Sequence, residues 1–255
     1  MKRYVLKLSL PVMALLSLLA VASFSHASLV AYWPGEGNAL DASPNGHDGT
    51  LSGTGFAPGV VGQAFSFDGI TDFISVPGDP ALQPPLLSVA LWVNASASNG
   101  LQLLIDSSHG AGAAGWAVQF NAAEQLSFAY GNGVSFPEVT STNIIADNTF
   151  HHIAAVFDGS TLSIFIDGLF DDAIAYTGTP AVQTANGGNI RLGRHFSLDR
   201  PLNGLLDEVR VYDHALNQAE ITALANPVPV PAGLPLFAAG LGLLGYVGWR
   251  KRRAS

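Results

Sequence analysis

Residues 151–168 read HHIAAVFDGSTLSIFIDG and contain the clearest strand pattern of this chain. It holds two apolar runs, 152–157 and 162–166, separated by Asp158-Gly159 and followed by Asp167-Gly168. Asp-Gly pairs readily adopt the positive φ angles that tight hairpin turns need. In the second run every other residue is a large aliphatic one, as expected for a strand with one face turned to a core. The stretch therefore predicts two antiparallel strands joined by a hairpin, with a second tight turn after them.

Similar short runs recur through residues 28–226, which we predict to form one all-β domain, a sandwich or barrel. The runs cover residues 64–67, 73–76, 89–93, 101–105, 116–120, 126–130, 152–157, 162–166, 174–176, 190–192 and 205–212. One stretch alone predicts a helix. Asn217 can cap it, Glu220 stands three residues later, and Ile221 and Leu224 supply a short apolar face. We expect this helix to cover one end of the sandwich.

The first 27 residues predict a signal peptide. Three basic residues precede the almost wholly apolar stretch 8–24. Small residues at positions 25 and 27 then match what signal peptidase reads, so we expect cleavage between Ala27 and Ser28. A retained N-terminal anchor is the alternative, and those small residues argue against it.

A second apolar segment lies at the other end of the chain. Residues 232–249 contain no charge, and as a helix they would span about 27 Å, just enough to cross a bilayer core. Arg250, Lys251, Arg252 and Arg253 follow directly. Basic residues stay on the cytoplasmic side, so we predict a transmembrane helix with the folded domain outside the cytoplasm.

A proline motif precedes this segment, made of Val228, Pro229, Val230, Pro231 and Ala232. Residues 227–255 thus combine a proline motif, a spanning helix and a basic end, and resemble the PEP-CTERM class of bacterial sorting tails. The nearest variant reads Val-Pro-Leu-Pro-Ala, with Val230 here in place of leucine. The resemblance implies that an exosortase-type enzyme processes the protein. It would then move from the inner membrane to the surface or extracellular matrix of a Gram-negative bacterium. A permanent single-pass anchor is the alternative.

The charges are divided sharply between the ends and the middle. Residues 28–226 hold four arginines and all nineteen acidic residues, a formal net charge of −15. Such a surface repels phosphate backbones, which excludes nucleic acid as a partner, and is compatible with divalent cations and hydroxyl-rich ligands. The chain has no cysteine, so an exported domain must rely on core packing or a bound metal rather than disulfides.

Five stretches along the chain resemble, in order, the motifs of laminin-G-like domains with a concanavalin A-type jelly roll. They are LVAYWPGEG at 29–37 with DASPNGHDGTL at 41–51, FDGITDFI at 67–74, HHIAAVFDG at 151–159, IFIDG at 164–168, and GLLDEVRVY at 204–212 with Ala215-Leu216. The resemblance implies a two-sheet sandwich that binds or adheres rather than catalyses. Phe150 departs from it, because the family usually has tryptophan there.

Some concanavalin-type domains hydrolyse glycans, but this chain lacks the patterns of two known kinds of catalytic site. The Glu-x-Asp-x-x-Glu pattern of laminarinase-like enzymes is absent, and so is a Gly-x-Ser-x-Gly nucleophile elbow. His151 and His152 are adjacent, and adjacent strand residues point to opposite faces, so a packing or hydrogen-bonding role is favoured over shared metal ligation. We expect no enzyme, with a hydrolase of unfamiliar site as the lesser alternative.

The loop that follows the first motif predicts a calcium site. Asp41-x-Ser43-x-Asn45-Gly46 matches the first half of a calcium loop, with oxygens at alternate positions and glycine at the turn. Ser52 stands where an EF-hand has its closing glutamate, so other ligands must come from elsewhere. The expected set is Asp41, Ser43, Asn45, Glu36 and Asp207, with Glu208 as an alternative to Asp207. The competing interpretation is an ordinary Asx-type turn.

Asp207 enters this set because of its predicted strand. Alternation places it on the face of Leu205, Val209 and Val211, which we take as the core face. A carboxylate there needs a partner, and either calcium or backbone amides could serve.

The expected function is binding of extracellular polysaccharide or matrix by an exported, non-catalytic surface protein. A structural surface protein without a specific ligand is the alternative. Aromatic residues that could stack on sugars are Trp33, Trp92, Trp116, Tyr130 and Phe136, although aromatics in a sandwich usually belong to the core. We assign Trp92 to the core on this basis.

Overall fold

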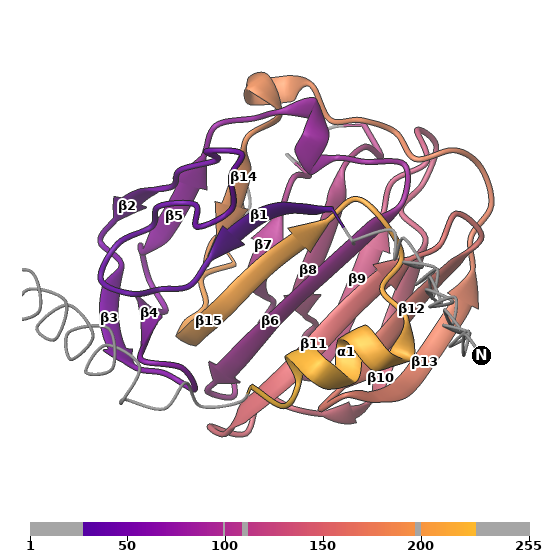
Figure 1. The fold of residues 1–255 in the computed structure, drawn as a ribbon. Coiled ribbons are helices and arrows are strands. Elements are labelled where there is room, and N and C mark those ends of the chain that lie inside the picture. The colour runs from indigo at the N-terminus through magenta and orange to yellow at the C-terminus, as the bar shows by residue number, and fades with distance from the viewer. Residues whose placement is uncertain (1–27, 99, 109–111, 197–199, 228–255) are drawn as a thin grey trace, which may run out of the picture.

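The structure is a computed structural model, and it describes residues 28–98, 100–108, 112–196 and 200–227. Two antiparallel β-sheets pack face to face, as Figure 1 shows. The predicted all-β sandwich is therefore confirmed. The predicted signal peptide 1–27 and the segment 228–255 lie outside the described residues. Within the described ranges, no helix is both long and apolar enough to cross a membrane.

The first sheet has eight strands, and the second has seven. In spatial order the first contains β13 (Leu169–Ala175), β12 (Thr161–Ile166), β11 (Phe150–Phe157), β6 (Leu87–Ala95), β15 (Asn203–Tyr212), β4 (Gln63–Asp68) and β3 (Gly55–Pro58), with β1 (Leu29–Trp33) paired to β15. The second contains β10 (Glu138–Ile144), β9 (Gln125–Tyr130), β8 (Trp116–Phe120), β7 (Gln102–Asp106), β14 (Ile190–Leu192), β5 (Phe73–Val76) and β2 (Thr50–Ser52). Two short 3-10 helices, η1 (Pro80–Leu82) and η2 (Ala185–Gly188), lie in connections.

The predicted hairpin is confirmed in β11 and β12, which pair along their length. The Asp158 carboxylate closes the turn by accepting hydrogen bonds from the amides of Ser160 (2.8 Å) and Thr161 (2.7 Å). At the next turn Asp167 and Gly168 both have positive φ, 52° and 80°, as a two-residue hairpin loop of type I′ requires. Two Asp-Gly pairs thus set the register of three consecutive strands.

The core between the sheets is rich in aromatic side chains whose polar atoms find partners. Trp33 and Trp116 are fully buried, and their indole N–H groups donate to the carbonyls of His47 (2.8 Å) and Leu82 (2.9 Å). The assignment of Trp92 to the core was wrong. It is only partly buried, because it faces outward from β6, where its ring meets that of His152 edge-on at 5.4 Å. Both faces of β6 are largely covered, so nearly every residue of the run 89–93 is apolar. The sequence alone therefore does not show which of them face the core.

The predicted helix is confirmed as α1 (Gln218–Leu224), with a complete capping box between Asn217 and Glu220. Its position differs from the expectation. It lies against the outer face of the first sheet rather than over an end of the sandwich (Figure 1). The reason is a second, smaller apolar cluster on that face, where Ile221 packs with Ala90, Ala154, Val156, Tyr212 and Leu216. Burying Ile221 there contributes about 1.5–3 kcal/mol.

Strand β15 contains a bulge that changes the predicted alternation. Glu208 has a φ of 56°, and the pairing with β6 shifts between Asp207 and Arg210. Leu206 rather than Leu205 therefore belongs to the core, and Asp207 is paired with the outward-facing Trp92. The prediction that Asp207 points into the core was wrong, although its side chain is fully buried. One extra residue moves the flanking side chains to the opposite face.

Candidate binding site

The predicted calcium loop is closed by its own hydrogen bonds. One carboxylate oxygen of Asp41 accepts from the amides of Tyr32 (2.9 Å) and Ser43 (2.8 Å). The other accepts from the Ser43 hydroxyl (2.7 Å) and the His47 amide (2.8 Å). Burial raises the pKa of Asp41, but these hydrogen bonds outweigh burial and hold it below its ordinary value. The structure thus brings Asp41 and Ser43 together as the centre of an Asx-type turn, and a calcium ion would have to replace these bonds.

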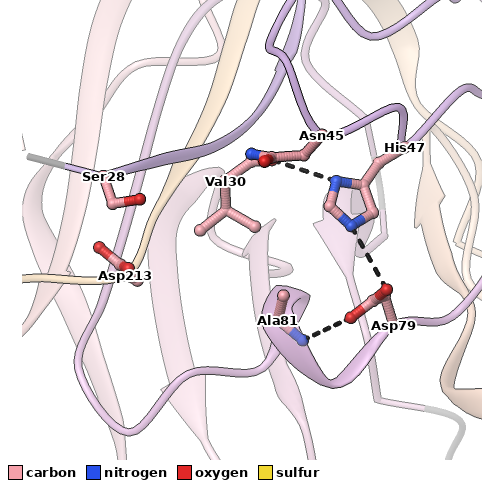
Figure 2. Close-up of a pocket in the computed structure, with 7 residues that line it drawn as sticks. All are labelled: Ser28, Val30, Asn45, His47, Asp79, Ala81 and Asp213. Atoms are coloured by element: carbon pink, nitrogen blue, oxygen red, sulfur yellow. Dashed lines mark hydrogen bonds and ion pairs between the residues drawn. The ribbon is translucent and has the colours of Figure 1, made fainter.

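Figure 2 shows the pocket beside this loop, which has a volume of about 320 Å³. Its lining residues are Ser28, Val30, Asn45, His47, Asp79, Ala81 and Asp213. The Asn45 side-chain amide donates to the Val30 carbonyl at 2.8 Å, and the two nitrogens of His47 lie 3.1 Å from that carbonyl and 3.7 Å from Asp79 Oδ2. These contacts tie the loop to β1 and to the segment preceding η1. The arrangement accounts for Asn45 and His47 as structural residues.

The two remaining predicted ligands lie at a different place, against the β3–β4 turn. Glu36 accepts a hydrogen bond from the Gln63 amide (3.2 Å), and Asp207 Oδ2 accepts from the amides of Val60 (2.7 Å) and Val61 (3.0 Å). Backbone amides are thus the partners of Asp207, one of the two possibilities predicted. Among the described residues, no group of three or more His, Asp or Glu side chains is placed to hold a metal ion.

Asp207 remains electrostatically costly in this position. Its second oxygen, Oδ1, is buried and has no hydrogen-bond partner among the described residues. Burial raises the pKa of Asp207 to about 6, against the lowering effect of the Val61 and Val60 amides and with a smaller raising contribution from Glu208. Folding therefore favours the protonated carboxyl.

The adjacent histidines have different environments: His151 is hydrogen-bonded to carboxylates, whereas His152 is buried. His151 lies between Asp167 (Nδ1 to Oδ2, 2.8 Å) and Asp147 (Nε2 to Oδ2, 3.4 Å), and these carboxylates raise its pKa despite the lowering effect of burial. His152 is fully buried on the outer face of the first sheet, and burial lowers its pKa to about 4.

A row of side chains crosses the outer face of the second sheet. Cross-strand pairing places Arg191, Asp106, Ala117, Ala129 and Glu138 side by side on β14, β7, β8, β9 and β10. The alternate positions Ile105, Val118, Phe128 and Val139 belong to the core, so this row faces outward. At about 4.8 Å per strand the row is about 19 Å long. Its third and fourth residues, Ala117 and Ala129, are alanines, which leaves this part of the row hollow.

We call this hollow the sheet groove. It contains a pocket of about 260 Å³ lined by Ser108, Ala117, Gln119, Ala129, Phe136, Glu138, His195 and Arg200. Phe136 is 40 % exposed and offers an apolar surface at one wall. Arg200 Nη1 donates a hydrogen bond to Gln119 Oε1 (2.7 Å), and the Arg200 carbonyl accepts from the Leu103 amide (3.1 Å). The groove thus combines a small-residue floor, an aromatic wall and fixed polar groups.

A buried polar layer supports the other wall. Asp106 is fully buried, accepts a hydrogen bond from the Ser108 hydroxyl (3.2 Å), and lies 3.5 Å from His195 Nε2. Burial raises the pKa of Asp106 well above its ordinary value, although Arg191 and Arg200 act to lower it. The Arg191 guanidinium lies 4.7 Å from the centre of the Phe196 ring, a second aromatic residue that is 37 % exposed.

The backbone positions of the two acidic residues in the row are too far apart for the close carboxyl pair of a retaining glycosidase. Asp106 and Glu138 are three strands apart, which is about 14 Å. A retaining pair needs about 5 Å and an inverting pair about 6.5–9.5 Å. The groove therefore has the features of a binding surface rather than those of this hydrolytic mechanism.

Of the groove residues, sequence reasoning named only Phe136. The others come from separate strands and a loop, and they have no local motif. Two signals were present. Small or polar residues alternate with the apolar ones in 116–120 and 126–130, and three of the four arginines of the domain fall within 191–200. Neither signal shows by itself which strands are neighbours.

Several solved structures have the same fold. Domain 4 of AbnA, an extracellular GH43 arabinanase from Geobacillus stearothermophilus solved with arabinotriose, has a TM-score of 0.65 at 21 % identity, covering 78 % of this chain and 99 % of that one. The binding domain of Paraclostridial Mosquitocidal Protein 1 has a TM-score of 0.66 at 16 % identity, covering 78 % and 52 %. The binding domain of botulinum neurotoxin DC, solved with SialylT, has a TM-score of 0.62 at 13 % identity, covering 78 % and 51 %. At these identities the likeness shows the fold, and the chain spans about half of the toxin domains.

No curated protein matches the chain. The family model described as the concanavalin A-like lectin/glucanases superfamily matches residues 68–222, from the end of β4 into α1. This segment includes every strand that forms the sheet groove. It also includes the central hairpin and the closing strand on which the laminin-G-like resemblance rested. The chain belongs to the concanavalin A-like lectin/glucanase superfamily.

Proposed function

We propose that this chain is an exported, surface-sorted protein whose domain binds glycans in the sheet groove. The observation that carries the proposal is the hollow over Ala117 and Ala129 between the exposed ring of Phe136 and the polar groups of Gln119 and Arg200. Ligand sites are typically concave, with an apolar lining and a few fixed polar groups.

The chemistry of a sugar suits this arrangement. Its apolar C–H face can stack on Phe136, while its hydroxyls can hydrogen-bond to Gln119, Glu138 and Arg200. Arabinotriose in the AbnA domain and SialylT in the neurotoxin domain support a carbohydrate ligand. Extracellular polysaccharide or matrix is the ligand source that fits an exported protein. A structural protein without a ligand, or a hydrolase, would give a different result in the test below.

The test is a glycan array probed with the full-length chain purified in a mild detergent. We expect retention of a defined set of glycans without turnover. Phe136→Ala should weaken this retention, and Ala117→Leu should remove it, because a larger side chain fills the hollow. Phe170→Ala is the matched control, since Phe170 is 59 % exposed on β13 of the opposite sheet. If no glycan is retained, or if Phe136→Ala and Phe170→Ala behave alike, the groove is not the binding site; turnover of an arrayed glycan would favour the hydrolase.

Export and sorting form the second part of the proposal and rest on the sequence. The leader 1–27, the motif at 228–232 and the basic end 250–253 support export, transient membrane anchorage and processing by an exosortase-type enzyme. Calcium at Asp41, Ser43 and Asn45 is a separate proposal, supported by their alternating oxygen atoms and by the acidic, cysteine-free domain.

A further inference from the structure

We infer that the sheet groove selects sugar residues that carry a carboxylate, such as uronic acids, through the guanidinium of Arg200. This inference rests on the proposed glycan-binding function and names the class of sugar. It is carried by the position, pairing and surroundings of Arg200 in the groove.

Within residues 28–98, 100–108, 112–196 and 200–227, Arg200 forms no ion pair with a carboxylate, although its charge acts on the buried Asp106 from a distance. Arg210, by contrast, is paired with Glu208. The hydrogen-bond partner of the Arg200 side chain among the described residues is the neutral amide of Gln119. No Asp or Glu oxygen in the described ranges lies within 4.0 Å of its guanidinium. In a domain with a formal net charge of −15, a cation that lines a pocket and has no acidic partner there is unusual.

The guanidinium is held in place from both ends. The backbone of Arg200 is attached to β7 by the Leu103 amide, and Nη1 is attached to β8 by Gln119 Oε1 at 2.7 Å. A guanidinium offers five donors in one plane, and this geometry fits a carboxylate through two parallel hydrogen bonds. Since one donor is used by Gln119, the remaining donors can serve a ligand at little cost in side-chain entropy.

The other acidic residues of the groove compete weakly for Arg200. Glu138 is on β10, two strands from Gln119, which is about 10 Å across the sheet. Asp106 is fully buried, and burial raises the pKa of its carboxyl well above the ordinary value, which favours its neutral form. Glu138 is placed to accept hydrogen bonds from sugar hydroxyls instead. The groove therefore has a cationic part at Arg200 and a hydroxyl-binding part at Glu138, joined by the alanine floor.

The net charge of the domain opposes the expected preference for acidic sugars, so observing that preference would point to a local contact. A net charge of −15 repels an acidic ligand at long range, so a preference for the acidic form must come from a local contact. Short oligosaccharides and an ionic strength of about 0.15 M reduce the long-range repulsion between domain and ligand, because the Debye length is then about 8 Å.

The experiment compares an oligogalacturonate with its methyl ester, which has the same sugar backbone without the charge. Binding to the full-length chain is measured by isothermal titration calorimetry. We expect the acid to bind at least about tenfold more tightly, since a hydrogen bond to a charged group contributes about 1.5–3 kcal/mol. Arg200→Gln should lower affinity for the acid to that for the ester, and Arg200→Lys should keep part of the difference.

Phe136→Ala is the matched control, because loss of a stacking surface should weaken the acid and the ester by the same factor. Melting curves of all variants report whether each is folded. If acid and ester bind equally well, or if folded Arg200→Gln keeps the preference, the carboxylate inference is wrong while glycan binding stands. If neither ligand nor any arrayed glycan binds, both the inference and the proposed function fail.

Discussion

Two separate buried groups, Asp207 and His152, allow a quantitative prediction about stability and pH. Burial raises the pKa of Asp207 from 3.8 to about 6 and lowers that of His152 from 6.5 to about 4. Each shift of roughly two units corresponds to about 3 kcal/mol. Both side chains are almost completely buried, so solvent screening reduces these contributions little.

The two contributions have opposite signs. A raised carboxyl pKa means that the folded state binds the proton more tightly. The Asp207 contribution is therefore present below about 3.8 and is lost as pH rises through about 6. A lowered imidazole pKa means that the unfolded state binds the proton more tightly. The His152 contribution is present above about 6.5 and is lost as pH falls toward 4. Between pH 4 and 6.5 the Asp207 contribution falls with rising pH while the His152 contribution rises, so in the wild type the two changes in stability nearly cancel.

Asp207→Asn should reveal the pH dependence of stability that His152 causes, because the opposing contribution of Asp207 is removed. Asparagine keeps an oxygen that can accept from the Val60 and Val61 amides, but it does not titrate. Relative to wild type, the variant should lose about 2.5 kcal/mol more at pH 4 than at pH 7.5, because the unfolded Asp207 is only partly protonated at pH 4. For a domain of this size this corresponds to a melting temperature about 5–10 °C lower.

The assay is thermal unfolding followed by circular dichroism at half-unit steps from pH 4 to 7.5. His152→Gln is the opposite control, because it leaves the Asp207 slope unopposed and should make the protein relatively more stable at pH 4. If the difference between Asp207→Asn and wild type does not change with pH, the carboxyl does not titrate differently in the folded state. Burial of Asp207 would then not raise its pKa in the folded protein.

Three further predictions concern other parts of the chain. If calcium binds at the opening loop, millimolar calcium should raise the melting temperature by several degrees, and magnesium should raise it much less. Asp41→Asn should remove this difference, whereas a melting curve unaffected by calcium and chelator leaves Asp41 as a turn residue. Replacing Pro229 and Pro231 by alanine, or deleting residues 250–253, should leave unprocessed protein in the inner membrane, and wild-type mass and amount at the surface would contradict the sorting proposal. Asn217→Ala removes the helix cap and should cost about 1 kcal/mol, measured as a drop of about 2–4 °C in melting temperature, whereas an unchanged melting temperature would show that the cap adds no stability.

Local chemistry explains which parts of the fold could be predicted. Asp158 and Asn217 accept hydrogen bonds from amides a few residues away, and Asp167 forms its turn through a positive φ beside Gly168, so these turns and the cap follow from nearby sequence. The position of α1 depended on the apolar cluster on the outer face of the first sheet, and nothing within 217–224 indicates that face. For the same reason Trp92 could not be distinguished from a core residue by its neighbours in β6.

The site was harder to predict than the fold, because its parts meet only after the sheet has formed. Asp106, Ala117, Ala129 and Glu138 are neighbours through three strand pairings, and no spacing in the sequence encodes these pairings. The predicted orientation of Asp207 was wrong for a different reason. A one-residue bulge at Glu208 reverses the alternation, and strand periodicity assumes that no residue is inserted.

The position of β15 in the first sheet determines the order in which the domain can be completed. This strand comes last in the chain, yet it pairs with β1, β4 and β6. Until residue 212 is available, those three strands lack a neighbour and leave backbone groups open to pairing with other chains. Such long-range pairing makes folding slow. A chain that crosses a membrane from its N-terminus would therefore have to remain unfolded, and protected from aggregation, until nearly the whole domain has emerged.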